Sequence, residues 1–238
     1  GSRSVTTQAT AINGVTEDLV EKMRPLAEEE LEIAGADLVW EDGRFAVTGT
    51  DRTVDLMTLA GVARQKGMTD LLSQRSERTL PGRSYPNGCH IAEVEIDPDT
   101  GVTTVDRYTV TDDFGTLMNP MLAEGQVHGG VAQGIGQAIT EQVVYDEDGQ
   151  LLSGTFMDYA MPRADNIPNM PFNSEPVPST ANYIGMKGLG EAGTVGALAA
   201  VTNAVLDAVW DQGVHHVDMP ATPLRVWNWL QGAKMAAE

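Results

Sequence analysis

At residues 185–209 the sequence reads GMKGLGEAGTVGALAAVTNAVLDAV, a glycine-rich loop followed directly by an apolar helical pattern. Gly188, Gly190 and Gly193 have the G-x-G-x-x-G spacing of a dinucleotide-binding turn, a motif that requires a strand before the glycines. The preceding stretch, EPVPSTANYIGMK, carries two prolines and is not typical of such a strand. Glu191 lies inside the loop, where its carboxylate would repel a pyrophosphate. NAD binding is therefore the weaker interpretation, and a plain helix start with Glu191 as a first-turn charge stays open beside it.

The composition indicates a folded chain with a sizeable core, since 42% of its 238 residues are hydrophobic. We expect one domain or two lobes, about 1–80 and 81–238. The formal net charge of −19 argues against a nucleic-acid or anionic-membrane partner. No apolar run approaches the roughly twenty residues of a membrane span, and we expect a cytoplasmic protein. The single cysteine, Cys89, excludes an internal disulfide or an iron–sulfur site built from this chain alone, and we expect its thiol to be buried.

Hairpin and helix patterns interspersed along the chain predict an α+β fold with hairpins and mixed sheets packed against helices. The helix over 16–35 is predicted to start at Thr16 as N-cap, and Pro25 is predicted to kink or split it. Asp42-Gly43 is a strong hairpin signal. Further helices are predicted over 53–67, 119–142 and 188–209 and from Pro223 onward, with hairpins over 89–110 and 142–154, an irregular stretch over 162–180 and a short strand over 215–219.

Residues 125–138, GQVHGGVAQGIGQA, place five glycines in or at the mouth of a predicted helix. Each interior glycine destabilises a helix by roughly 0.5–1 kcal/mol relative to alanine. Either another backbone packs very closely against this helix, or a flat ligand approaches its main chain. The amides of Gln126 and Gln133 can both donate and accept, as the edge of a pterin or pyrimidine requires. The glycines alone leave both explanations open.

Six stretches, taken together and in order, resemble one known family. They are GSRS at 1–4, HIAEVEIDPDTG at 90–101, DDFGTLMNPMLAEGQVHGGVAQGIGQA at 112–138, DYAMPRADNIP at 158–168, GMKGLGEAGTVGA at 185–197 and DMPATPLRVW at 218–227. The chain is similar to the C-terminal part of the molybdenum-cofactor subunit of the xanthine dehydrogenase, aldehyde oxidase and carbon monoxide dehydrogenase family. The resemblance spans nearly the whole chain, and it implies the molybdenum-cofactor-binding fold of the xanthine dehydrogenase type.

The resemblance also implies roles for individual residues. Glu191 falls on the glutamate of the family's KGxGE motif, which is the active-site base and would take a proton from the oxygen that attacks the substrate. Gln126 falls on a glutamine that hydrogen-bonds the pterin. The protein supplies no direct metal ligand in most members, so we expect none here. The remaining cofactor-lining positions implied by the resemblance are Ser2, Arg3, Ser4, Asn119, Lys187, Gly188 and Gly190.

The implied cofactor is molybdopterin with molybdenum, in the cytosine dinucleotide form common among bacterial relatives with a GSRS stretch. The implied partners are the N-terminal part of the molybdenum subunit, a [2Fe-2S] subunit and an FAD subunit, and we expect a dimer of such heteromers. The reaction would be hydroxylation of an aldehyde, a purine or another N-heterocycle with oxygen from water. Two alternatives stay open: an NAD-binding dehydrogenase that uses Gly188, Gly190 and Gly193, and a non-catalytic assembly module.

Overall fold

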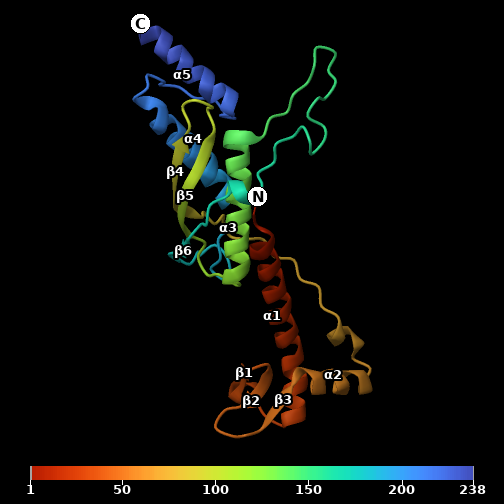
Figure 1. The fold of residues 1–238 in the computed structure, drawn as a ribbon. Coiled ribbons are helices and arrows are strands. Elements are labelled where there is room, and N and C mark those ends of the chain that lie inside the picture. Colours follow the sequence, from red (N-terminus) through yellow and green to blue (C-terminus); the bar gives the residue numbers. More distant parts are fainter. Residues whose placement is uncertain (1, 238) are drawn as a thin grey trace. The chain divides into compact units, whose positions relative to one another are not determined.

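The computed structural model describes residues 2–237 and divides the chain into two compact units, each with its own hydrophobic core. The smaller unit consists of Ser4–Gly82 and Ala181–Tyr183. The larger unit contains Arg83–Thr180, the stretch from Ile184 onward and the described residues before Ser4. Both units combine helices with small sheets (Figure 1), which confirms the α+β fold class.

The smaller unit packs two helices with a three-stranded antiparallel sheet of order β1-β2-β3. The predicted hairpin turn is confirmed: Asp42 and Gly43 have φ of 48° and 76°, the pair of positive values that a two-residue turn between twisted strands requires. The elements of this unit are α1 (Ser4–Leu31), β1 (Leu38–Glu41), β2 (Arg44–Val47), β3 (Thr53–Asp55) and α2 (Leu56–Gln65).

The first helix is longer than its apolar pattern. α1 begins at Ser4, so the prediction of Thr16 as its N-cap is wrong. The Thr16 hydroxyl donates to the carbonyl of Ile12 at 2.8 Å, the bond by which a threonine is satisfied inside a helix. The helix also continues through Pro25 without the predicted break.

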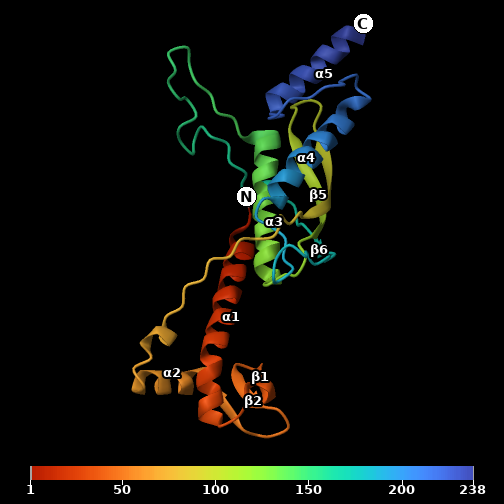
Figure 2. The same ribbon diagram turned by 180° about the vertical axis from the view of Figure 1, so that it is seen from behind.

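The larger unit packs α3 against α4 and α4 against β4 of a second three-stranded sheet, of order β4-β5-β6 (Figures 1 and 2). The predicted hairpin is β4 with β5, and the end of β5 pairs in parallel with β6. A π-helical turn, Gly136–Thr140, extends α3. The elements are β4 (Asn87–Ile96), β5 (Thr103–Asp113), α3 (Pro120–Ile135), β6 (Phe172–Ser174), α4 (Ala192–Trp210) and α5 (Pro223–Ala237).

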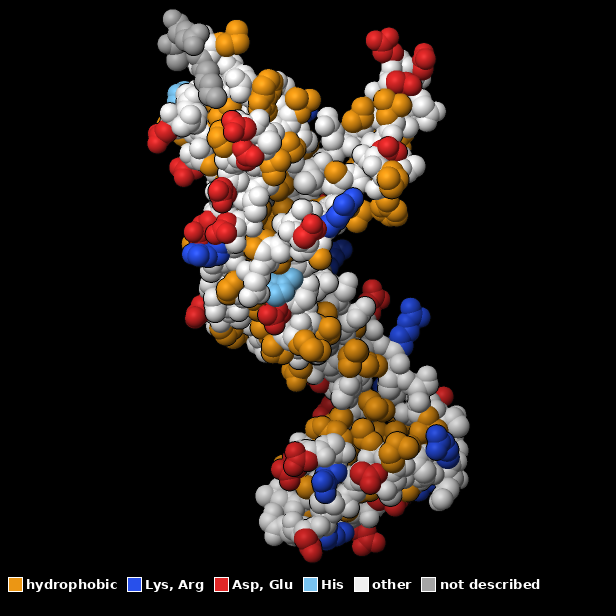
Figure 3. Space-filling view, viewed as in Figure 1, with side chains coloured by type: hydrophobic (Ala, Val, Ile, Leu, Met, Phe, Trp, Pro, Cys, Tyr) orange, Lys and Arg blue, Asp and Glu red, His pale blue; other side chains and the backbone are white. Residues whose placement is uncertain are grey.

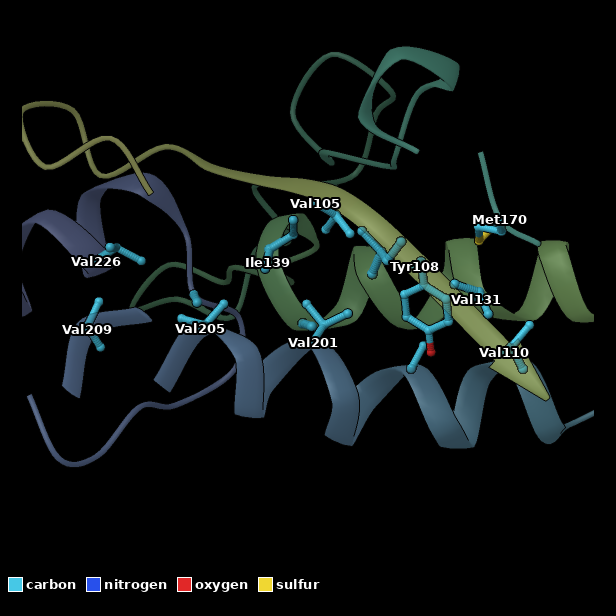
Figure 4. Packing of buried hydrophobic residues seen from close by; sticks show 14 of the residues in the cluster. Val105, Tyr108, Val110, Val131, Ile139, Met170, Val201, Val205, Val209 and Val226 are labelled. Carbon is cyan, nitrogen blue, oxygen red and sulfur yellow. The ribbon is translucent and has the colours of Figure 1, made fainter. Parts of the chain in front are cut away.

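The core of the larger unit is built from β-branched side chains that meet between β5, α3 and α4 (Figure 4). Val201 and Val205 of α4 are fully buried, as are Val110 of β5 and Val131 of α3. Tyr108 reaches from β5 toward α4 and is the largest of the fully buried side chains. This core holds the last residues of β5 and the first residues of α4 in place. Both segments carry residues of the candidate site or of its support.

α4 has the length and hydropathy of a membrane-spanning helix, contrary to the expectation that no apolar run is long enough. Its buried positions, Gly193, Ala197, Val201, Val205 and Val209, recur every four residues and form one stripe. That stripe packs against α3 and the sheet. α4 therefore packs as the core helix of a globular unit.

Several local predictions for the larger unit are wrong or incomplete. The segment 215–219 is not a strand, because it pairs with no neighbour within the described chain. The hairpin predicted over 142–154 is reduced to one bridge, between Tyr145 and Leu151. β6 lies inside the stretch predicted to be irregular. The prediction that Cys89 is buried is wrong: the residue is exposed. Successive residues of β4 face opposite sides of the sheet, and the neighbouring His90 is the one that faces inward.

Residues 141–163, which we call the arm, leave the end of α3 as a long, mostly irregular excursion (Figures 1 and 3). Apolar side chains lie exposed along it, with Phe156 at 83% and Met157 at 93% of full exposure. Acidic side chains gather at its tip, where the sequence reads DED at 146–148. The arm therefore presents a run of apolar side chains at its surface.

Candidate functional site

The glycine-rich loop 185–190 leads into α4 and places Glu191 at its start. The backbone carbonyl of Glu191 accepts the first helical bond, from Val195 at 3.0 Å, but the carboxylate makes no capping bond to the helix. The side chain is exposed, and the hydroxyl of Ser2 donates to its Oε2 at 3.0 Å. The carboxylate is thus turned away from its own helix and toward a residue far away in sequence.

Four of the other predicted residues lie close to one another, and one of them, Ser2, contacts this carboxylate. A Cβ added to Gly188 would collide with the backbone of Ser2 and lie 3.1 Å from its Cβ. A Cβ on Gly190 would lie 3.2 Å from the Ser2 hydroxyl oxygen and 3.7 Å from the amide nitrogen of Gln126. The structure therefore brings Ser2, Gln126, Gly188, Gly190 and Glu191 together in the larger unit.

The glycines of α3 divide into two groups with different surroundings. A Cβ on Gly130 would lie 2.9 Å from the backbone nitrogen of Thr194, and one on Gly134 would collide with the side chain of Ala197. At Gly125 and Gly129, by contrast, an added Cβ would meet nothing within 4 Å. Close packing is confirmed at Gly130 and Gly134, which lie against α4. At Gly125 and Gly129 the main chain is open, and ligand contact there stays a prediction.

Lys187 differs from its neighbours in the loop because its side chain points inward. It is 9% exposed, and its ammonium forms a salt bridge with Asp113, the last residue of β5. Burial raises the pKa of Asp113, but hydrogen bonds from Lys187 and from the backbone of Val177 and Gly115 together outweigh it and hold the pKa below its usual value. The Lys187 side chain therefore ties the loop to the sheet, and only its neighbours present polar atoms to the open face.

The remaining predicted positions are less central. Asn119 is the N-cap of α3, and its side chain accepts from the backbone of Leu122 at 3.0 Å. Arg3 is exposed in the larger unit. Ser4 begins α1 and belongs to the smaller unit, so it is not placed beside Glu191 by the fold of the larger unit.

Sequence reasoning missed a second polar cluster, buried between the β4–β5 hairpin and α4. His90 Nδ1 lies 2.7 Å from the Tyr108 hydroxyl, and Nε2 lies 3.2 Å from Oδ1 of Asp112. Burial and the nearby Asp112 carboxylate raise the pKa of Tyr108. A Cβ on Gly196 of α4 would collide with the imidazole ring. The signal in the sequence was the single inward-facing histidine on an otherwise apolar strand face.

The open face offers hydrogen-bonding groups rather than a metal cage. Across residues 2–237 no group of three or more histidine, cysteine or acidic side chains is arranged to hold a metal ion. A carboxylate, an amide and a hydroxyl lie together instead, at Glu191, Gln126 and Ser2. Such a set suits a flat, polar ligand that brings its own metal, with a carboxylate beside it to accept a proton.

Comparison with known proteins gives the family to which the chain is similar. A family model described as a molybdopterin cofactor-binding domain matches residues 1–168. The carbon monoxide dehydrogenase large chain of Hydrogenophaga pseudoflava is 38% identical over 99% of this chain and 30% of its own length. Subunit gamma of the 6-hydroxypseudooxynicotine dehydrogenase complex of Paenarthrobacter nicotinovorans is 36% identical over the same shares. A crystal structure of Cu,Mo-CO dehydrogenase aligns with a TM-score of 0.88 at 32% identity, over 98% of this chain and 30% of that one.

The chain therefore belongs to the molybdenum hydroxylase family of xanthine dehydrogenase, aldehyde oxidase and carbon monoxide dehydrogenase, whose members are molybdopterin-dependent oxidoreductases. It spans 30% of the length of these curated relatives. Family membership favours a molybdenum hydroxylase over a Rossmann-type NAD site at Gly188, Gly190 and Gly193. Gly193 in particular packs against α3: a Cβ added to it would lie 3.0 Å from the Cα of Gly130.

Proposed function

We propose that this chain supplies the catalytic base, Glu191, and one wall of the cofactor pocket to a molybdenum hydroxylase complex. The observation that carries this proposal is the position of the Glu191 carboxylate, which is exposed, is not used as a helix cap and lies beside Ser2 and the glycines of the loop. A carboxylate held in this way can accept a proton from a group that approaches the open face.

The residues of the open face fit a molybdopterin. Gly125 and Gly129 leave space for a planar ring system to approach the backbone of α3. The Gln126 amide can donate to and accept from a pterin edge, and exposed Arg3 can pair with a phosphate in the cytosine dinucleotide form. When bound, the cofactor supplies the redox chemistry through its molybdenum. This chain contributes the orientation of the ring system and a proton acceptor at the Glu191 carboxylate.

Asn119 and Lys187 have indirect roles in this proposal. Asn119 fixes the first turn of α3 through its bond to Leu122, which sets the direction of the open face. Lys187 anchors the loop through Asp113. Ser4, the first residue of α1, stays a proposed cofactor-lining position.

The proposed complex contains the remainder of the molybdenum subunit, a [2Fe-2S] subunit and an FAD subunit, as a dimer of heteromers in the cytoplasm. The exposed apolar side chains of the arm and of Met118 and Met121 beside the open face support a covering partner. The substrate is a small molecule hydroxylated with oxygen from water: an aldehyde, a purine or another N-heterocycle. A relative whose name gives 6-hydroxypseudooxynicotine as its substrate supports the heterocycle class.

Purification of the native complex, followed by metal and nucleotide analysis, tests this proposal. We expect one molybdenum per copy of this chain, release of CMP on mild hydrolysis, and turnover with members of an aldehyde, purine and N-heterocycle panel. Gln126→Ala should lower the molybdenum content, whereas the matched change Gln137→Ala, at an exposed position of the π-helical turn, should not. A complex without molybdenum, together with NAD binding by the chain, would overturn the proposal in favour of the dinucleotide interpretation.

A further inference from the structure

Asp113 receives hydrogen bonds from four separate parts of the larger unit. Its Oδ1 accepts from the backbone N–H of Gly115 at 2.8 Å and of Val177 at 2.9 Å. Its Oδ2 accepts from the side-chain amide of Asn87 at 3.1 Å and from the ammonium of Lys187. The side chain is 10% exposed. A single buried carboxylate thus joins the start of β4, the turn after β5, the 177 segment and the glycine-rich loop.

The loop is fixed at the same place by its backbone. The N–H of Lys187 donates to the carbonyl of Phe114 at 2.7 Å, and the N–H of Thr116 donates to the carbonyl of Gly185 at 3.1 Å. Between the two glycines of the loop, Leu189 packs against the core, and its carbonyl accepts from the N–H of Ala192 at 3.2 Å. Gly188 and Gly190 therefore lie between an anchor at Lys187 and the start of α4, and both approach Ser2 closely.

A buried ion pair is a poor source of stability, because the cost of removing two charges from water offsets much of their attraction. Removing one partner alone is a different matter, since it leaves an unpaired charge in the interior. Backbone and amide donors already hold both oxygens of Asp113, so the position of the carboxylate that Lys187 must reach is fixed. It therefore determines where Lys187, and with it the next four residues, can lie.

We propose that Asp113 is a positioning residue for Glu191, acting through its salt bridge to Lys187. The proposal rests on the proposed function, in which Glu191 is the base. Asp113 does not touch the open face, and its effect on the reaction is to hold the loop so that the carboxylate of Glu191 meets the reacting group in one fixed geometry. Displacement of such a group by about 1 Å can lower a rate about 10²-fold.

The test uses the assembled complex with three variants and a control. Asp113→Asn leaves Lys187 charged and unpaired, and Lys187→Gln leaves Asp113 charged and unpaired. The double variant D113N/K187Q removes both charges and lets the new amides hydrogen-bond to each other. Arg107→Gln is the control, because Arg107 pairs with Glu93 at 3.4 Å on the exposed side of the same sheet.

The first readout is hydrogen–deuterium exchange of the amides from residues 187 to 191, which does not depend on turnover. We expect faster exchange in each single variant, exchange restored toward the parent in the double variant, and no change in Arg107→Gln. The second readout is the acid limb of the pH profile of kcat/KM, which reports ionisation of the base. It should shift in the single variants and return in the double variant, while kcat falls about 10²-fold in the single variants with KM little changed.

Unchanged exchange of the loop in Asp113→Asn would overturn the proposal. So would a loss of turnover in the single variants with an unaltered pH profile, since that is the pattern of a general loss of fold. Failure of the proposed function is distinguishable: Glu191→Gln would then keep its turnover, while the exchange of residues 187–191 would still respond to Asp113→Asn.

Discussion

The two groups of glycines in α3 and α4 predict opposite effects of the same small substitution. At Gly129 an added Cβ meets nothing within 4 Å, so Gly129→Ala gains only helix propensity, about 0.5–1 kcal/mol in the free energy of unfolding. At Gly193 the Cβ would collide with the carbonyl of Val127 and lie 2.9 Å from the nitrogen of Val131. Both are backbone atoms, so the helices must separate, and Gly193→Ala should cost about 1–3 kcal/mol.

Thermal unfolding should be measured on cofactor-free protein, where loss of the cofactor does not change Tm, and molybdenum content on the purified complex. For a chain of this size, the gain at Gly129 corresponds to a rise of about 1–4 °C in Tm. The same Gly129→Ala variant should lose molybdenum, because its methyl group occupies the surface proposed for the cofactor. Full molybdenum loading of Gly129→Ala would refute the location of the cofactor on this face. A Gly193→Ala variant as stable as the parent would refute the close packing of α3 on α4.

Three further predictions concern substitutions at single positions. Burial and Asp112 raise the folded-state pKa of Tyr108, so the neutral phenol stabilises the fold fully below the unfolded pKa of about 10. This contribution is lost as the pH rises above that value. In urea denaturation curves, Tyr108→Phe should remove this part of the decline in stability at alkaline pH. Asn119→Ala should lower the free energy of unfolding by about 1 kcal/mol, because the bond to Leu122 is lost. Chemical denaturation measures this loss, and an unchanged molybdenum content would show that Asn119 acts only as a helix cap. Gly43→Ala should destabilise the β1–β2 hairpin by about 1–2 kcal/mol because φ is 76°, and an unchanged Tm would contradict the assigned turn.

The parts of the fold that the sequence predicts correctly are those set by local patterns. Alternation in β4 and β5 and the Asp42-Gly43 turn are examples, since neighbours in sequence determine both. The start of α1 was missed because its first turns carry threonines instead of an apolar stripe. β6 was missed because it is only three residues long and exists only by pairing in parallel with β5.

The site shows the same division. The positions of Glu191, Gly188 and Gly190 followed from a motif within one loop. The salt bridge between Lys187 and Asp113 joins residues 74 positions apart, and no local pattern reveals it. The approach of Ser2 to Glu191, 189 positions apart, is likewise a product of the tertiary fold. Sequence patterns singled out the loop as a candidate site, whereas only the fold showed what holds the loop in place.

The most direct test of Glu191 as the base is the rate at which substrate reduces the molybdenum centre. This rate can be measured in the assembled complex by anaerobic stopped-flow absorbance. Glu191→Gln keeps the size of the side chain and its bond to Ser2 but cannot accept the proton, and Glu95→Gln, at an exposed position on β4, is the matched control. With full molybdenum loading, we expect Glu191→Gln to slow the reduction by about 10²–10⁴-fold and Glu95→Gln to leave it unchanged. Reduction of the fully loaded Glu191→Gln complex at the parent rate would contradict the assignment of Glu191 as the base.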